Sequence, residues 1–293
     1  MQGDLISGVL LPLILAFIMF SLGLGLTVGD FQRIFTQPRA LLVGVVCHFV
    51  LLPLACFLLL SAWGMTGVFA VGFMILAACP TSSTSNLLTY LARGDVALAL
   101  SFTAVASVAT IFTLPLGVTW ARGHYLGAAR AVDVPVGLMM GQVAMVLGLP
   151  VSAGMWVRHR WGAWARAFEP RATRIATVLF VLIVVLAVLK NWALLRDNFA
   201  SLAPFALLLN LSMLAVGFAM ARAMRLSRSQ SVTLGIETAV QNAALALVIA
   251  STVLKDDAMA IPGALYGVLM YAGGLLFALA MRRLLPPVAA PVH

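Results

Sequence analysis

Glu237 is the residue best placed to do chemistry, because it is the one carboxylate that lies well inside an apolar stretch of the chain. A charged side chain at membrane depth costs about 2.5–3.5 kcal/mol even on the lenient insertion scales, so such a residue is a candidate functional group. Gln241 lies four residues further on, on the same helix face, and Thr238 and Asn242 add further oxygen atoms. Hard cations such as sodium bind several oxygens, and one carboxylate supplies the compensating charge. The alternative is a protonated Glu237 that only joins helices by hydrogen bonds.

A second polar cluster interrupts another apolar stretch, with the sequence Cys79-Pro80-Thr81-Ser82-Ser83-Thr84-Ser85-Asn86. Pro80 removes one helical N–H donor and frees a carbonyl group. In lipid, such a break is tolerated only where the backbone lines a cavity or is buried in protein. The freed groups and the hydroxyls can therefore satisfy one another or a ligand. A plain proline kink, with the hydroxyls bonded back onto the preceding turn, is the alternative.

Three further polar side chains lie inside apolar stretches. Thr103 and Ser107 are four residues apart and share a helix face, which is a weak signal because such residues are common in membrane helices. His48 is rarer at such a position. We interpret it as a buried neutral histidine bonded to a neighbour, and a role in a site or in proton coupling is the alternative.

The composition indicates which elements must position these residues. Of 293 residues, 63% are hydrophobic and only 9% are charged, whereas soluble domains are about 45–50% apolar and about 25% charged. A soluble enzyme and a disordered chain are therefore disfavoured. The Lys and Arg residues behind the net charge of +9 lie between the apolar stretches. Their positions indicate membrane topology, so no nucleic-acid partner is expected. The chain is expected to reside in a lipid bilayer.

A membrane-spanning helix needs roughly 20 mainly apolar residues. Nine stretches qualify, at 5–28, 40–63, 67–92, 96–121, 134–157, 174–195, 199–223, 230–254 and 258–281. No connection is long enough for a soluble domain, so residues 1–293 are expected to form a single transmembrane domain.

The loops between these stretches carry unequal positive charge. One side carries Arg122, Arg130, Lys190, Arg196 and Lys255, and the other carries the remaining 13 of the 18 Lys and Arg residues. Cytoplasmic loops carry the excess of Lys and Arg. We therefore expect the carboxyl terminus in the cytoplasm and the amino terminus outside, in the inner membrane of a cell.

The two polar clusters occupy corresponding positions in the two halves of the chain. Ser85-Asn86 and Gln241-Asn242 are 156 residues apart, counted from Asn86 to Asn242, and five spans separate them. An odd spacing inverts the topology of one half relative to the other. Paired interrupted helices of this kind indicate a transporter with a site near the membrane midplane.

The chain resembles the bile acid:sodium symporter family, and its bacterial members in particular, over essentially its whole length. The stretches that carry the resemblance are Met19-Phe20-Ser21-Leu22-Gly23-Leu24 with Asp30-Phe31, Cys79-Pro80 through Ser85-Asn86, Thr89-Tyr90-Leu91-Ala92-Arg93-Gly94-Asp95-Val96-Ala97-Leu98, Glu237-Thr238-Ala239-Val240-Gln241-Asn242 and Pro262-Gly263-Ala264-Leu265.

The resemblance implies an all-α, inverted-repeat transporter of nine spans, in which two discontinuous helices cross near the site. It also implies two groups of spans. The panel-like spans are 5–28, 134–157 and 174–195, and the core-like spans lie within 40–121 and 199–281.

The resemblance also implies two sodium sites and a substrate site. The first sodium site maps onto Ser85, Asn86, Thr103 and Glu237, with Ala99 where a further hydroxyl is expected. The second maps onto Glu237, Gln241 and the backbone carbonyls of Thr238 and Val240, with His48 where a glutamine is expected. The substrate is expected near Ser83, Thr84, Asn242, Met270 and Tyr271. Half-helix amino termini at that position suit an anion.

The expected function is secondary active transport of a small organic anion, a carboxylate, by sodium-coupled symport and alternating access. Sodium ions are the coupling ions, and no other cofactor is expected. One alternative is the same fold run by protons or uncoupled, with Glu237 and His48 titrating. A remote alternative is an intramembrane lipid-modifying enzyme, for which Asp256-Asp257 is the only carboxylate pair. A receptor or structural membrane protein has no reason to bury Glu237 beside a broken polar helix.

Overall fold

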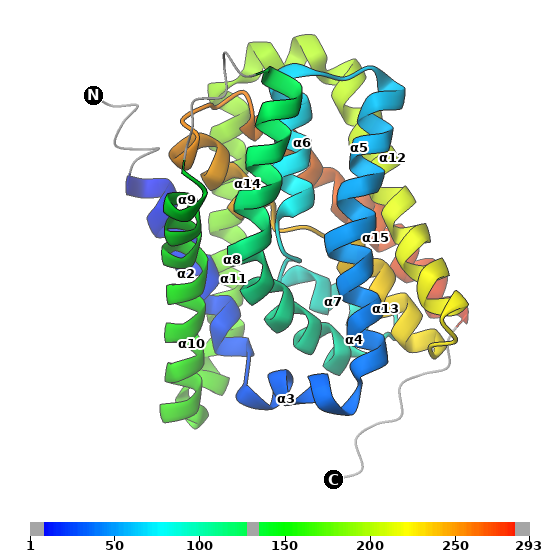
Figure 1. Ribbon diagram of the computed structural model, residues 1–293. Helices are drawn as coiled ribbons and strands as arrows, with labels where there is room; N and C mark the ends of the chain where they lie inside the picture. The colour runs from blue at the N-terminus through cyan, green and yellow to red at the C-terminus, as the bar shows by residue number, and fades with distance from the viewer. Residues whose placement is uncertain (1–8, 128–134, 285–293) are drawn as a thin grey trace.

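The computed structural model describes residues 9–127 and 135–284, and these residues form a bundle of helices (Figure 1). The helices are α2 (Leu11–Gly25), α3 (Val28–Thr36), α4 (Pro38–Val46), α5 (Leu52–Trp63), α6 (Gly67–Ala78), α7 (Thr84–Leu91), α8 (Val96–Leu126), α9 (Val136–Val143), α10 (Leu149–Arg160), α11 (Gly162–Lys190), α12 (Trp192–Ala223), α13 (Arg228–Ala239), α14 (Ala243–Val248) and α15 (Ala260–Leu284). Three π-helical turns join or extend them: η2 (Cys47–Leu51), η3 (Ala144–Gly148) and η4 (Ile249–Val253).

Six helices in the described ranges are long and apolar enough to cross a membrane. They are Pro38–Trp63, Val96–Leu126, Val136–Arg160, Gly162–Lys190, Trp192–Ala223 and Ala260–Arg283. Large apolar side chains point outward along them, such as Leu42, Leu58 and Val178, which are 56–67% exposed. A water-soluble bundle would not leave such a surface uncovered. The chain is therefore a multi-pass, all-helical membrane protein with six candidate spans.

Three shorter apolar helices accompany these six: Leu11–Gly25, Gly67–Ala78 and Ala243–Val253. They coincide with the first, third and eighth stretches that the sequence predicts to span the membrane. Residues 5–8 of the first predicted span and residue 134 of the fifth lie outside the described part of the chain. The number of nine spans stays a prediction.

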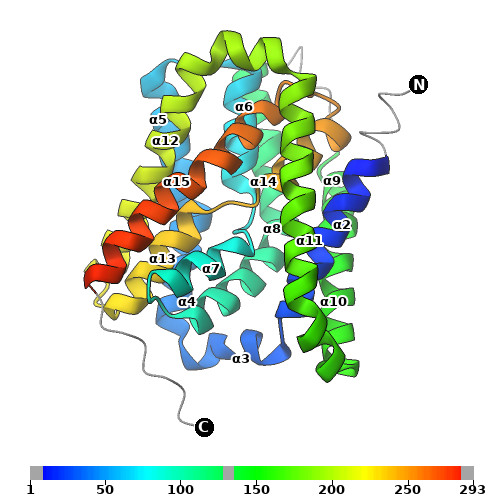
Figure 2. The ribbon, with the colours of Figure 1, turned by 180° about the vertical axis from the view of Figure 1, so that it is seen from behind.

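Helices α2, α10 and α11 pack together along one side of the molecule (Figure 2). Glycine permits the closest approach, because Gly23 on α2 faces the backbone of Val151 and Gly154 on α10 faces the backbone of Phe20 and Leu24. Small buried side chains, Ala165 and Ala172, then let α11 approach Leu24. This side of the bundle is therefore held by backbone-to-backbone packing.

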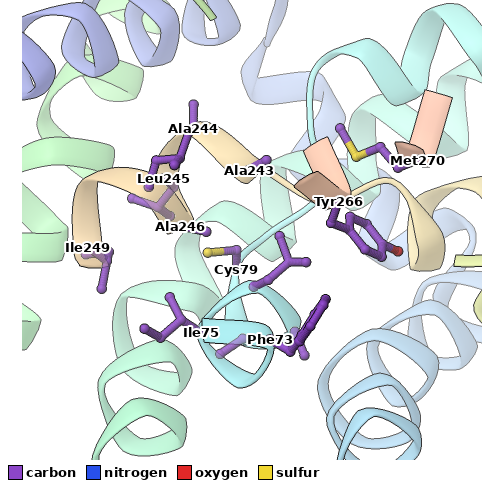
Figure 3. Close-up of a cluster of buried hydrophobic side chains, with 14 of the residues drawn as sticks. Phe73, Ile75, Cys79, Ala243, Ala244, Leu245, Ala246, Ile249, Tyr266 and Met270 are labelled. Carbon is purple, nitrogen blue, oxygen red and sulfur yellow. The ribbon is translucent and has the colours of Figure 1, made fainter. Parts of the chain in front are cut away.

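The remaining helices surround a larger buried cluster. Phe73 on α6 and Phe205 on α12 lie with their ring centroids 4.5 Å apart. Figure 3 shows further members of this cluster, from α6, α14 and α15, gathered around Cys79. Because these side chains are apolar apart from the hydroxyl of Tyr266, the polar groups nearby must find partners within the protein.

Two helices are broken at the predicted polar clusters, and the breaks lie against each other. The first break separates α6 from α7, and the second separates α13 from α14 (Figure 1). Thr81 and Gln241 form an antiparallel bridge. Ser82 N donates to Val240 O at 3.1 Å, and Asn242 N donates to Pro80 O at 2.8 Å. Each break therefore satisfies backbone groups that the other exposes, so the first break is more than a plain proline kink.

The loops that were assigned to each side of the membrane lie together at opposite ends of the bundle (Figure 1). At the arginine-rich end, Arg93 Nη1 donates to Arg282 O at 3.2 Å. At the opposite end, Lys190 pairs with Asp257 at 2.7 Å. Arg130, which was assigned to that end, lies outside the described residues. The grouping of the loops agrees with the sequence, and the orientation in the membrane stays a prediction.

We predict that Gly154→Ala destabilises the protein by about 1–3 kcal/mol, because the added methyl group overpacks the contact with α2. The new Cβ atom would lie 2.8 Å from Leu24 N, which is backbone and cannot rotate away. The unfolding midpoint in detergent measures the effect. Gly141→Ala in α9 is the matched control, since its Cβ meets nothing within 4 Å and should leave the midpoint unchanged or slightly raised. Equal midpoints for both variants would contradict the close approach of α2 and α10.

Candidate functional site

The Glu237 carboxylate is fully buried at the last turn of α13, just before the second break. Ser85 Oγ donates to Oε1 of Glu237 at 2.6 Å, and Thr103 Oγ1 lies 3.4 Å from Oε2. These hydroxyls come from the first turn of α7 and from the amino-terminal third of α8. The structure therefore brings together three residues of the first predicted sodium site, which lie up to 152 residues apart in the chain.

Two amide oxygens of the predicted sodium ligands have no hydrogen-bond donor among the described residues, namely Asn86 Oδ1 and Gln241 Oε1. Asn86 follows Ser85 on α7, and Gln241 lies in the second break. A buried carbonyl oxygen without a partner costs about 1–3 kcal/mol, so these atoms are suited to a ligand that accepts lone pairs. Sodium is such a ligand, and the carboxylate of Glu237 offers the charge to match it. Ala99 is buried on α8 and offers no oxygen of its own.

The two backbone carbonyls predicted for a second sodium site already accept hydrogen bonds within the protein. Gln241 Nε2 donates to Thr238 O at 2.7 Å, and Val240 O accepts from Thr81 Oγ1 and from Ser82 N, each at 3.1 Å. These two backbone carbonyls already have donors, so they are less open to an ion than the first set, whereas the Gln241 side-chain oxygen Oε1 has no donor among the described residues. Sodium binding at either set stays a prediction.

His48 lies in the π-helical turn η2 and is fully buried. Its Nε2 is 2.9 Å from Cys79 O, and its Nδ1 is 3.3 Å from Glu237 O. A neutral imidazole can donate only one of these bonds. The ring therefore lies between carbonyls at the ends of α6 and α13 and donates to one of them. This agrees with the interpretation of a buried neutral histidine bonded to a neighbour.

A cavity of about 420 Å³, including space open to solvent, lies beside the crossing of the two breaks. All five predicted substrate residues line it: Ser83, Thr84, Asn242, Met270 and Tyr271. The hydroxyl of Thr84 lies 2.9 Å from those of both Ser82 and Tyr271. Asn242 Oδ1 accepts from Leu245 N at 3.0 Å and so caps α14. The sequence therefore predicts this wall of the cavity, and substrate binding there stays a prediction.

The amino termini of α7 and α14 both adjoin this cavity, since Thr84 and Ala243 belong to its lining. A helix amino terminus carries a partial positive charge and unpaired N–H groups, which favour anions. Among the described residues, the cavity lining contains no Lys or Arg. An anion held there would be stabilised by backbone dipoles and hydroxyl groups rather than by a cationic side chain.

The opposite wall of the cavity was not predicted from the sequence. It comes from α2 and α11, and its polar members are Thr173 and Thr177 on α11, with Phe180 one turn further on. Thr177 Oγ1 donates to Thr173 O at 2.8 Å. Two threonines at a spacing of four were the available signal, although such pairs are frequent in membrane helices.

Asn210 and Tyr266 were missed as well, although both are fully buried polar residues beside the second break. Tyr266 Oη donates to Ala239 O at 2.7 Å, and Asn210 Nδ2 donates to the same oxygen at 3.1 Å. Ala239 is the last residue of α13, so its carbonyl has no intrahelical partner. A lone asparagine among leucines in the 199–223 stretch was a signal in the sequence.

The acidic residues Asp256 and Asp257 have separate roles. Asp256 Oδ1 accepts from Ala258 N at 3.0 Å and from Met259 N at 3.3 Å, whereas Asp257 pairs with Lys190. They do not converge on one position as a pair of catalytic carboxylates would.

These features define an all-helical membrane protein with a polar site where two broken helices meet, which is the arrangement typical of secondary transporters. The model of the Sodium Bile acid symporter family matches residues 12–198, and the chain belongs to this family. The resemblance seen in the sequence is thus confirmed at the level of the family, which consists of transporters and not of enzymes.

Several curated relatives are similar to the chain. The probable sodium/metabolite cotransporter BASS1, chloroplastic, of Oryza sativa subsp. japonica is 29% identical over 273 residues, which is 93% of this chain and 66% of the relative. The ileal sodium/bile acid cotransporter of Cricetulus griseus is 30% identical over 182 residues, which is 62% of this chain and 52% of the relative. The sodium-dependent organic anion transporter of Rattus norvegicus is 27% identical over 251 residues, 84% of this chain and 66% of the relative. The chain thus spans about two thirds or less of the length of these relatives.

We predict that Asn210→Leu and Tyr266→Phe are each mildly destabilising, whereas the double variant loses more stability than the two changes summed. Either residue alone still donates to Ala239 O, and removing both leaves a buried carbonyl unpaired at a cost of about 1–3 kcal/mol. A double-mutant cycle of unfolding midpoints in detergent measures the coupling. Tyr90→Phe is the control, because Tyr90 is 64% exposed. Strict additivity would show that the two side chains do not share this carbonyl.

Proposed function

We propose that the chain transports a small organic anion across a cell membrane together with sodium, by alternating access. The observation that carries this proposal is the buried Glu237 carboxylate, which faces the hydroxyls of Ser85 and Thr103. The next residue on α7, Asn86, has a buried amide oxygen with no donor among the described residues. The relatives named as sodium cotransporters, of bile acids or of metabolites, support the same cation and the same class of cargo.

The proposed architecture has nine membrane crossings. The six long helices supply six of them, and α2 with the two broken pairs, α6–α7 and α13–α14, supplies the other three. The antiparallel pairing of Thr81 with Gln241 supports two halves of inverted topology. The amino terminus is then outside and the arginine-rich end is cytoplasmic. A bacterial-type inner-membrane protein fits this arrangement.

The proposed panel domain contains α2, α9–α10 and α11, and the proposed core domain contains α4–α8 and α12–α15. Glycine contacts hold α2 against α10, and the crossing of the breaks holds the core together. The cavity lies between the two groups, because α11 forms one wall and the breaks form the other. A relative movement of panel and core would therefore expose the cavity to one side of the membrane and then to the other.

Sodium and anion are coupled through the first turn of α7. Ser85 donates to Glu237, whereas Ser83 and Thr84, two residues and one residue before it, line the cavity. When sodium binds, the Ser85 hydroxyl turns its lone pairs to the ion, and the charge of Glu237 is neutralised. This fixes the α7 amino terminus in the form that receives the anion. Coupling requires that the ion prefer this form, which is a differential affinity.

The cargo is proposed to be small and to carry a carboxylate. The cavity holds about 420 Å³ with its open part, and its polar members are hydroxyls and an asparagine. Such a lining gives hydrogen bonds to a compact polar anion, and the amino termini of α7 and α14 face its charge. The Na⁺ bound beside Glu237 adds to the positive potential.

A proton-coupled carrier is the second candidate. The observation in its favour is that His48 and Glu237 are both buried and that the imidazole contacts the Glu237 backbone. Either group could hold the proton that replaces sodium. Uptake measured in sodium and in choline, each across pH, separates the two: dependence on sodium at every pH supports symport with sodium, and uptake that follows only the proton gradient supports the alternative.

We predict that Glu237→Gln abolishes sodium-dependent uptake, and that Ser85→Ala raises the sodium concentration for half-maximal uptake about tenfold by removing one oxygen ligand. Proteoliposomes with small carboxylates as cargo provide the measurement, after thermal-shift screening of the same compounds with and without sodium. Asp197→Asn is the control, since Asp197 is an exposed partner of Arg196. Sodium-independent uptake that survives Glu237→Gln would refute both cation mechanisms.

A further inference from the structure

An ion pair joins the two sides of the bundle at the end opposite the arginine-rich loops. Lys190 is the last residue of α11, and its Nζ lies 2.7 Å from Asp257 Oδ2 in the turn that precedes α15. Asp256 fixes this turn, because its carboxylate accepts from the N–H groups of Ala258 and Met259. Asp257 is thus held on a rigid turn, whereas Lys190 reaches it through a long flexible side chain.

A second cavity, of about 360 Å³ including open space, lies directly at this ion pair. It is lined by both partners, by Leu186 and Ala187 on α11, and by Leu247 and Ser251 on α14 and η4. Its walls are otherwise mainly apolar. The cavity therefore lies at the same interface as the first one, between α11 and the second broken helix.

The two cavities follow one another along α11. The face of α11 that lines the first cavity carries Thr173, Thr177 and Phe180, and the face that lines the second carries Ile183, Ala187 and Lys190. Steps of three and four residues keep these positions on one side of a helix. Across from α11, the wall passes from Ala243 and Ala244 to Leu247 and Ser251 in the same way. Figure 2 shows α11 running along the bundle in front of α14.

We propose that the second cavity is an outer vestibule for the anion, in which Lys190 binds the carboxylate of the incoming cargo and Asp257 holds Lys190 when the vestibule is closed. The inference rests on the proposed function, since it assigns the first contact of the same cargo. Lys190 is the one cationic side chain that lines either of the two cavities described here. Its ion pair is 34–46% exposed, and such pairs are weak in water, so a carboxylate can displace Asp257.

Displacement of Asp257 also frees the interface. The ion pair links α11 to the turn before α15, so its loss removes a tie between the proposed panel and the proposed core at this end. Entry of the anion is thereby linked to opening of the vestibule. Phe180 and Ile183 lie between the two cavities on α11, and the cargo passes them to reach the crossing.

Uptake kinetics test the role of Lys190. Lys190→Met is expected to raise KM for the anion about tenfold with little change in the maximal rate, because one charge-assisted contact of the entering cargo is lost. Asp257→Asn is expected to lower KM, since Lys190 is then free. Arg196→Met, at the same end and in an exposed pair with Asp197, is the matched control. Changes of KM in the same direction for both variants would overturn the proposal.

Thiol labelling tests, without any transport assay, whether the Lys190–Asp257 pair closes the vestibule; we call this pair the gate. Ser251 lines the vestibule and is 9% exposed, so it is the position to replace by Ser251→Cys. The native cysteines are free but buried. Purified protein with Ser251→Cys is expected to react several-fold faster with a maleimide when Asp257→Asn is added, whereas Ser201→Cys, an exposed site, reacts equally in both backgrounds. Equal rates at Ser251→Cys would overturn the gate. Failure of sodium-dependent uptake together with a rate increase here would refute the proposed function and leave the gate standing.

Discussion

The structure depends on one constraint: backbone groups freed where a helix breaks inside a membrane must be bonded within the protein. This chain breaks two helices and lays the breaks against each other. Thr81 lies opposite Gln241 in an antiparallel bridge, and the two backbone bonds that make this bridge run from Ser82 N to Val240 O and from Asn242 N to Pro80 O. Neither break would be stable alone, because an unpaired buried N–H or C=O costs free energy comparable to a lost hydrogen bond. The antiparallel pairing therefore fixes both breaks at the same depth, and every other feature of the site follows from it.

Several buried polar side chains donate hydrogen bonds to backbone carbonyls at the helix ends that are not paired in the crossing. His48 lies between the carbonyls of Cys79 and Glu237 and, as a neutral imidazole, donates to one of them, and Asn210 and Tyr266 share the carbonyl of Ala239. With the backbone satisfied in this way, the side chains of Glu237, Ser85 and Thr103 are left to face one another. The crossing thus separates polar groups that maintain the fold from polar groups that are available to an ion. It also directs two helix amino termini to one cavity, which is lined by hydroxyls and is where we propose that the anion binds.

Much of this site could be predicted from the sequence, because polar residues inside apolar stretches are conspicuous. Pro80 with its run of hydroxyls indicated one break, and Glu237 with its neighbours indicated the other polar segment. Asn210 was equally visible, but its role depends on Ala239 O, whose exposure follows from where α13 ends. The pairing of Thr81 with Gln241 joins residues far apart in the chain, and residue spacing alone cannot give such a register. The α11 wall was missed for the same reason, since its threonines gain meaning only from the helix packed opposite them.

We propose that a cation binds where Ser85, Thr103 and Glu237 converge, beside the crossing of the two breaks. The most direct measurement is an experimental structure of the protein with thallium(I) as a heavy sodium surrogate, located by its anomalous scattering and displaced by excess sodium. We expect a peak bonded to the Glu237 carboxylate that disappears in Glu237→Gln and in high sodium. A peak elsewhere that persists in Glu237→Gln, or none at Glu237 in well-ordered crystals, would contradict it.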